Sequence, residues 1–427
     1  MIPTLVFFAL AIGLYLKFGR GFIIFYPFLM FFLAVIYPAI TDVYSSIQPE
    51  SNFYTVLLTL SVKLLLVIVS FQIIIKFDRS KIFYFILIFL SYVFVLTLFS
   101  KDVFASWTRL LIVASNFLVL PASIIIFQDG IARSRFEKVI LYTNIFSVIY
   151  IIYTSYFQIG FVVYGNEVLR FGGLFFFGLY LFVFSIPIFI HALSKRFSIV
   201  LLVLVLSEIA LLFLSLKRTY LLFVGVFLFA FILVLIFFEK KKYLGFLLIA
   251  ILIGVGFYSF DGILETQNLR DRELTSESLE SEGRYLEYLI YFDDRVNSIS
   301  YRSFIGQNPF ANTGDFGHDN IYGLNVNDRS LHSDFVVYLY GIGIFGFILF
   351  IFIFVQIFNN LIYLNTRFSK LRLNKSLLVL SFTYFLVLLI SHSIDGLYIY
   401  WARAFPFSVL GYLIAKNQVV VYELHNK

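Results

Sequence analysis

The chain has 427 residues, of which 61% are apolar and only 13% are charged. A soluble domain is about half apolar and about a quarter charged, so the bilayer must be the main solvent of this chain. This composition excludes a soluble enzyme, a nucleic-acid-binding protein and a disordered scaffold. The net charge of +7 fits the basic bias of cytoplasmic loops in a membrane protein. The absence of cysteine excludes disulfides, thiolate metal sites and cysteine nucleophiles.

Apolar runs separated by polar breaks predict thirteen membrane-spanning helices, because one span needs about 20 apolar residues. The expected spans are 2–16, 21–40, 53–75, 82–100, 109–127, 139–164, 172–194, 197–216, 219–238, 243–260, 334–359, 376–394 and 398–415. Barrel strands would be half as long and would alternate apolar with polar residues. We therefore expect an all-α, polytopic integral membrane protein with twelve or thirteen transmembrane helices, twelve if the short first run does not cross.

Lysine and arginine gather in every second connection, starting with the one after the first span. These connections and the C-terminal tail hold nineteen of the 32 basic residues. Cytoplasmic loops carry the excess of basic residues, so this set is predicted to face the cytoplasm. The C-terminus then lies inside, and the N-terminus lies outside if the first run crosses. That run has no basic leader and no small-residue cleavage site, so we expect it to be retained.

One connection is much longer than the others. Residues 261–333 form a polar segment on the predicted outer face, and its apolar spacing over 283–300 predicts an amphipathic helix on the membrane surface. A loop of this length is uncommon unless it has a function. The predicted organisation is an N-terminal bundle of about ten spans (1–260), the outer loop (261–333), C-terminal spans (334–415) and a cytoplasmic tail (416–427).

Several basic side chains lie on the predicted outer face, against the positive-inside tendency. Arg218 lies beside Lys217 in a polar turn, Arg170 lies between two spans, and Arg403 lies near the outer end of the last span. An arginine inside the membrane costs roughly 2.5–3.5 kcal/mol on insertion scales, and its planar fork suits a pyrophosphate at headgroup depth. The alternative is snorkelling to lipid headgroups, which we favour for Arg109 or Arg403 singly but not for Arg218.

Two histidines lie near the predicted outer face. His332 stands at the junction between the long loop and the next span, and His392 lies near the end of a span, three residues before Asp395. A neutral imidazole suits proton removal near neutral pH. The alternative is a polar anchor at the interface, which is the commoner role of a lone histidine. The motif around His332 favours a base there.

Other polar features in the spans are ambiguous or carry no cofactor chemistry. A G-x-G-x-x-G run at 341–346 lies inside an apolar helix, where glycines allow close helix packing, so it does not predict nucleotide binding. Lys63 and Glu208 are the charges deepest inside spans, and each could pair, relay protons or fill a polar cavity. No metal-ligand cluster appears, so we expect neither a metal nor a cofactor.

Four motifs resemble those of the Wzy polymerase and O-antigen ligase superfamily. They are the turn Ser215–Arg218, the loop opening Gly283–Glu287, the glycine turn Phe304–Pro309 and the closing stretch His332–Phe347. This resemblance implies a bacterial inner-membrane glycosyltransferase that uses undecaprenyl-pyrophosphate-linked oligosaccharide as donor and acceptor. Arg218 and Arg284 would hold the pyrophosphate and His332 would act on the acceptor hydroxyl.

The remaining outer-face residues take supporting roles under the same resemblance. Lys217 and Arg170 would help to bind the pyrophosphate, and Arg403, His392 and Asp395 would be substrate contacts. We favour a repeat-unit polymerase because the loop sequence is idiosyncratic. A ligase that transfers lipid-linked glycan to lipid A core is the first alternative, and a flippase is the second. The expected partners are lipid-linked oligosaccharide, membrane lipids and a chain-length regulator, with no nucleic acid.

Overall fold

The structure is a computed structural model of the whole chain. It describes residues 2–41, 53–77, 81–100, 103–159, 162–163, 166–170, 177–196, 198–215, 218–239, 288–289, 300–306, 309, 320–321, 324–325, 333–371, 373–394 and 404–425. The predicted span 243–260 and almost all of the long loop, including most of the predicted amphipathic helix, lie outside the described residues.

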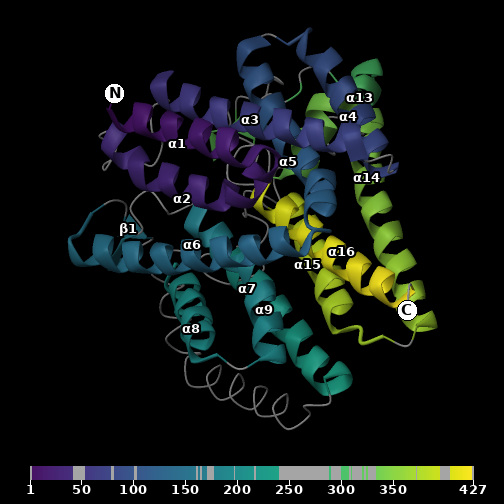
Figure 1. Cartoon of the computed structure of the whole chain (residues 1–427). Coiled ribbons are helices and arrows are strands. Elements are labelled where there is room, and N and C mark those ends of the chain that lie inside the picture. The colour runs from purple at the N-terminus through teal and green to yellow at the C-terminus, as the bar shows by residue number, and fades with distance from the viewer. Residues whose placement is uncertain are drawn as a thin grey trace.

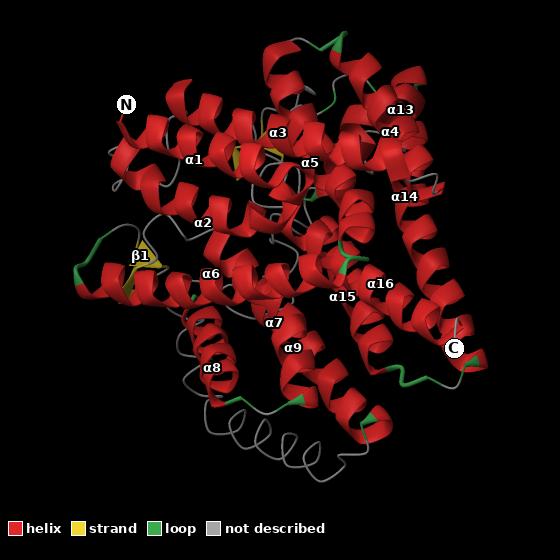
Figure 2. Cartoon of the chain, in the orientation of Figure 1, coloured by secondary structure: helices red, strands yellow, loops and turns green. Residues whose placement is uncertain are grey.

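The described chain is helical apart from two short β-hairpins, which confirms the predicted fold class (Figures 1 and 2). The N-terminal helices are α1 (Ile2–Phe18), α2 (Phe22–Thr41), α3 (Phe53–Phe77), α4 (Lys81–Thr97), α5 (Val103–Ile126), α6 (Gly130–Tyr156), α7 (Phe177–Lys195), α8 (Ile199–Leu214) and α9 (Arg218–Leu233), which a π-turn, η3 (Val234–Phe238), extends. The C-terminal helices are α13 (Tyr301–Ile305), α14 (Asp334–Lys370), α15 (Ser376–Ile394) and α16 (Ala404–His425). The hairpins pair β1 (Val162–Val163) with β2 (Asn166–Arg170) and β3 (Asn320–Ile321) with β4 (Leu324–Asn325).

Seven helices among the described residues are long and apolar enough to cross a membrane, and three shorter helices are also apolar. Their outward-facing side chains are largely apolar: Tyr84, Ile88 and Phe94 on α4 are each about half exposed. Such a surface would be anomalous in water, where contiguous apolar patches are small. It therefore fits a polytopic protein whose outer side chains contact lipid.

Helix α6 differs from its predicted span of 139–164. It begins nine residues earlier, where the Asp129 side chain caps the helix by accepting a hydrogen bond from the Ile131 amide at 3.0 Å. It ends at Tyr156, and Gln158 then takes a positive φ of 55°, which stops the helix before the apolar run is finished. The rest of that run continues into the β1–β2 hairpin rather than into the membrane span.

Contacts between helix ends join ends that the sequence predicts on the same side. On the predicted cytoplasmic side, the Lys195 ammonium lies 2.7 Å from the Glu239 carboxylate, which also accepts from Asn374 at 3.2 Å. Burial alone would raise the pKa of Glu239, but hydrogen bonds from Lys195 and neighbouring groups leave that pKa below its usual value. Likewise, Lys416, which directly follows the predicted span 398–415, lies 2.9 Å from Glu137, which comes just before the predicted span 139–164. The alternation of loops is thus consistent with the fold, and the absolute orientation stays a prediction.

The centre of the bundle is helix α5, which packs against α3, α4 and α16 (Figure 1). At the crossing with α16, a Cβ added to Gly411 would lie 2.6 Å from the Ser123 Cβ, so only glycine allows this approach. Small residues at such crossings let helix backbones pack closely where no hydrophobic effect drives association. The arrangement fixes α16 and its neighbour α15 beside the first residues of α14, where the candidate site lies.

Candidate functional site

Helix α14 is not straight, although it follows one continuous apolar run. Gly343 has φ 66° and ψ −179°, a non-helical conformation in the middle of the element. The ring of Phe335 lies 5.9 Å from that of Phe350, whereas fifteen residues of straight helix would separate them by about 22 Å. The segment Asp334–Ile342, which we call the arm, therefore folds back along the rest of α14.

This fold-back corrects the expectation of a single straight span from 334 to 359. Only the part after Gly343 runs through the bundle to Lys370, and the arm packs beside it. Asp334 consequently lies about 13 Å below the turn, the length of nine helical residues. Almost every arm residue is buried, which satisfies the rule that irregular backbone at membrane depth must be covered by protein.

Two glycines and a tyrosine build the turn. A Cβ on Gly343 would lie 2.5 Å from the backbone nitrogen of Gly306, which follows α13, and Gly306 also has a positive φ of 85°. Helix α13, which belongs to the long loop, thus rests directly on the turn of α14. From α4, the Tyr92 hydroxyl lies 2.5 Å from the Ile305 carbonyl oxygen and 3.2 Å from that of Ile342. The phenol thereby links the last residue of α13 with the residue just before the turn of α14.

The deep end of the arm is joined to α15 by a buried hydrogen bond between Asp334 and His392. His392 Nδ1 lies 2.6 Å from Asp334 Oδ2, and the two side chains are 1% and 0% exposed. Ser333 caps the arm by accepting a long hydrogen bond from the Val336 amide at 3.5 Å. The imidazole is enclosed by the rings of Phe117, Phe350, Phe354 and Phe407, at centroid distances of 6.3, 5.4, 5.1 and 5.8 Å.

A tyrosine of the long loop reaches the same point. The Tyr288 hydroxyl donates to the Ser393 carbonyl oxygen and lies 2.8 Å from each of Ser393 O and Ser333 Oγ. Because the phenol has one proton, which it gives to the carbonyl, Ser333 acts as the donor in the second bond. The arm, the long loop and α15 therefore meet at one place, which we call the clamp: Tyr288, Ser333, Asp334, His392 and Ser393.

Most of the predicted site residues lie outside the part of the chain that the structure describes. His332, Arg284, Lys217, Arg403 and Asp395 lie outside the described residues. Arg218 is the first residue of α9, and its side chain also lies outside the described part. In sequence, His332 immediately precedes Ser333 of the clamp. Of the predicted residues, the structure thus describes the side chains of Arg170 and His392.

Arg170 is fixed at the end of α6 that is predicted to lie outside. Its amide donates to Ser155 Oγ at 2.9 Å, and its carbonyl oxygen accepts from Thr154 Oγ1 at 2.6 Å. The guanidinium Nε donates to Gln158 Oε1 at 2.8 Å. These bonds hold the β1–β2 hairpin on α6 and place a cationic side chain at the predicted outer rim.

The two deep charges do not pair with each other. The Lys63 ammonium donates to the Tyr26 hydroxyl at 2.9 Å. Glu208 is fully buried on α8, and neither carboxylate oxygen has a hydrogen-bond partner among the described residues. Of the alternatives that the sequence leaves open, a Lys63–Glu208 ion pair is therefore wrong.

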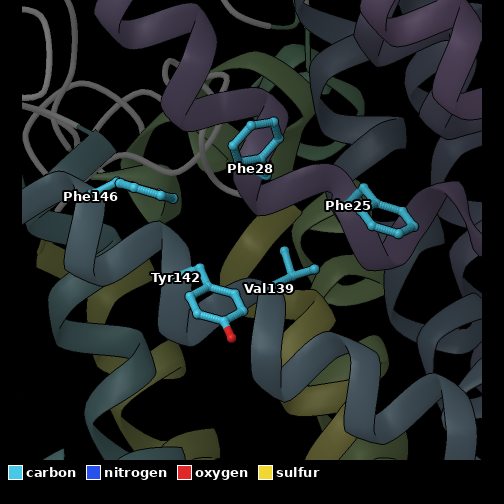
Figure 3. Close-up of a pocket in the computed structure, with 5 residues that line it drawn as sticks. All are labelled: Phe25, Phe28, Val139, Tyr142 and Phe146. Carbon is cyan, nitrogen blue, oxygen red and sulfur yellow. The ribbon is translucent and has the colours of Figure 1, made fainter. Parts of the chain in front are cut away.

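A surface cavity of about 400 Å³ lies between α2 and α6, far in sequence from the clamp. Phe25 and Phe28 of α2 face Val139, Tyr142 and Phe146 of α6 across it (Figure 3). Its lining is almost wholly apolar, so it offers no group for transfer chemistry. Across the described ranges, no three His, Asp or Glu side chains gather closely enough to hold a metal ion.

Residues 199–351 match the Wzy_C family, whose description is O-antigen ligase. The match runs from α8 through α9 and the long loop to the first part of α14 beyond its turn. The predicted resemblance is therefore confirmed over these residues, as a match to the Wzy_C O-antigen ligase domain. No curated protein and no solved structure matches the chain.

Three residues of this region were not predicted from sequence. Asp334 is an acidic residue at the start of an apolar run, where charges are rare. That position was the one sequence signal that could have identified it. Tyr92 and Tyr288 carried no comparable signal, because the chain has 29 tyrosines and most positions look alike. Their partners are 213 and 45 or more residues away in sequence.

Proposed function

We propose that this protein is a membrane glycosyltransferase that polymerises undecaprenyl-pyrophosphate-linked repeat units on the outer face of a bacterial inner membrane. The observation that carries this proposal is the Wzy_C match over 199–351. That range encloses Arg218, Arg284 and His332, the residues whose chemistry suits the reaction. The C-terminus would be cytoplasmic, and a chain-length regulator would be a partner.

The proposed reaction joins an acceptor hydroxyl to the anomeric carbon of the donor sugar. A new carbon–oxygen bond forms, the bond between the sugar and the pyrophosphate breaks, and the pyrophosphate leaves on its lipid. His332 takes the proton of the hydroxyl, which requires a neutral imidazole. Arg218 and Arg284 stabilise the charge that develops on the leaving group, an electrostatic task that fixed guanidinium groups perform well.

The remaining predicted residues fit supporting roles. Lys217 and Arg170 add positive charge at headgroup depth, and Arg403 and Asp395 are candidate sugar contacts. Arg218 begins α9, so the positive end of the helix dipole adds to its own charge near a pyrophosphate. The hairpin that carries Arg170 is held rigidly on α6 by the hydrogen bonds of Thr154 and Ser155, which supports a positioned cation there.

A ligase is the second candidate, because the matching family is described as O-antigen ligase. A deletion strain analysed by a glycan ladder separates the candidates. Core carrying a single repeat unit indicates a polymerase, and bare core with accumulated lipid-linked polymer indicates a ligase. Repeat units trapped on the inner face would indicate a flippase and refute glycosyl transfer. Complementation by the wild-type gene is the control.

A further inference from the structure

We propose that the Asp334–His392 pair is a positioning device that holds His332 in place for the transfer step, and that His392 does not touch substrate. This inference rests on the proposed function, because it assigns a purpose to the arm in that reaction. It begins with the fold-back of α14, which places the deep end of the arm inside the bundle.

The surroundings of His392 argue against a direct role in chemistry. The side chain is 1% exposed, one ring nitrogen is engaged by Asp334, and four phenylalanine rings enclose the imidazole. A sugar hydroxyl or a pyrophosphate could not reach this ring without displacing the rings around it. His392 therefore fixes the position of the Asp334 carboxylate rather than contacting substrate.

The clamp fixes the backbone immediately after His332. Ser333 is fully buried, it donates to Tyr288, and its own oxygen caps the arm. Asp334 is bonded to His392 in the next position. Two hydrogen-bonded side chains thus hold the backbone at residues 333 and 334, and consecutive Cα atoms are only about 3.8 Å apart. The far end of the arm is anchored as well, at Gly343 and Tyr92, so the arm is held at both ends.

Such an anchor matters because general-base catalysis depends on distance. A displacement of about 1 Å can lower a rate about 100-fold. A histidine that follows a long loop would sample many positions unless the residue after it were fixed. The buried pair supplies this restriction from α15, and Tyr288 couples it to the loop itself.

The test uses a spin label on a cysteine that replaces His332, which is specific because the chain has no other cysteine. Mobility is measured by electron paramagnetic resonance on the full chain in nanodiscs. With the native pair, the label should be immobilised. Asp334→Ala removes the partner of His392 and should produce a mobile component, whereas Asp334→Asn can still accept a hydrogen bond from His392 and should keep the label immobile.

Two further variants guard against misfolding and unspecific effects. The double change Asp334→Leu with His392→Phe replaces the buried pair by apolar groups, an exchange that often preserves folding, and should also free the label. Ser381→Ala is the matched control, since it removes a buried hydrogen bond between α15 and Asn417 of α16 away from the arm. It should leave the label immobile.

Activity is measured separately in variants that keep His332. Asp334→Ala should lower kcat by about 100-fold with little change in KM for the lipid-linked donor, and Asp334→Asn should restore most of it. An equally immobile label in the native chain and in both pair-less variants would overturn the positioning role, whatever the activity. The spin label could respond as expected while the native protein transfers no glycan. That result would support the positioning role of the clamp and overturn the proposed function.

Discussion

Replacing Gly343 by alanine tests the fold-back of α14 directly. The added Cβ would lie 2.5 Å from the Gly306 nitrogen and 2.5 Å from the Phe304 carbonyl oxygen, and both are backbone atoms that cannot rotate away. The native φ of 66° with ψ of −179° is a combination that essentially only glycine adopts.

The magnitude follows from these two penalties. Holding a residue with a side chain in that backbone region costs about 1–3 kcal/mol, and overpacking against a rigid neighbour costs about 1–3 kcal/mol. Gly343→Ala should therefore lower the free energy of unfolding by about 2–6 kcal/mol, or straighten α14 and release the arm. Either result should shorten the glycan, because the residue after His332 loses its anchor.

The assay is thermal unfolding of the purified protein in nanodiscs, combined with a glycan ladder in the deletion strain. Gly225→Ala in α9 is the matched control, since its Cβ would meet nothing within 4 Å. That change should be neutral or stabilise by about 0.4–1 kcal/mol, because it reduces the entropy of the unfolded chain. A Gly343→Ala protein with the wild-type melting temperature and glycan length would refute the fold-back.

Four other outcomes follow from the fold and the proposed site. Cysteines at Phe335 and Phe347, whose rings lie 5.4 Å apart, should be cross-linked by a short bifunctional thiol reagent, whereas a straight helix would hold them about 18 Å apart, beyond its reach. A cysteine at Ser278 should react with a membrane-impermeant thiol reagent in spheroplasts, and labelling only after lysis would invert the topology. Arg218→Lys keeps the charge but loses the bidentate fork, so polymer should fall sharply at constant protein level; full-length glycan would leave only a headgroup anchor. His332→Ala should lower the transfer rate about 10²–10⁴-fold, and restored polymer in His332→Gln would exclude a general base.

Most of the helices could be predicted from the sequence, because a helix that is surrounded by lipid must be apolar over its whole length. The run 376–394 coincides with α15. At α6 the same criterion failed at both ends for different reasons. At the N-terminal end, three charged residues precede the apolar run and were therefore left out of the predicted span: Arg133, Arg135 and Glu137. They still lie inside α6, since arginine and glutamate are good helix formers at a water-exposed helix start.

The fold-back of α14 could not be predicted from local pattern. The run from Phe335 to Val355 is free of charged and amide side chains, and its glycines suggest close packing without identifying the partner. What decides the turn is Gly306 of the loop and Tyr92 of α4, the latter 250 residues before its partner Ile342. Hydropathy carries no such information.

The candidate site shows the same limit. Residue chemistry and motif spacing pointed to His332 and the arginines. His392 was also identified, but beside Asp395 in sequence, whereas its bonded partner is Asp334, 58 residues earlier. A partner of this kind is set by how α14 and α15 pack, which depends on tertiary contacts rather than on neighbours in the chain.

The contact of Tyr92 with two carbonyls also constrains the order of biogenesis. Helix α4 leaves the ribosome long before α13 and the arm. The Tyr92 hydroxyl therefore enters the bilayer before either of its acceptors, the carbonyl oxygens of Ile305 and Ile342, has been synthesised. The arm has only nine residues, too few to cross by itself, and it must leave the translocon with the rest of α14 before it can bend. The early helices therefore assemble first and form the surface on which α13 and α14 pack, and the C-terminal third packs against it last.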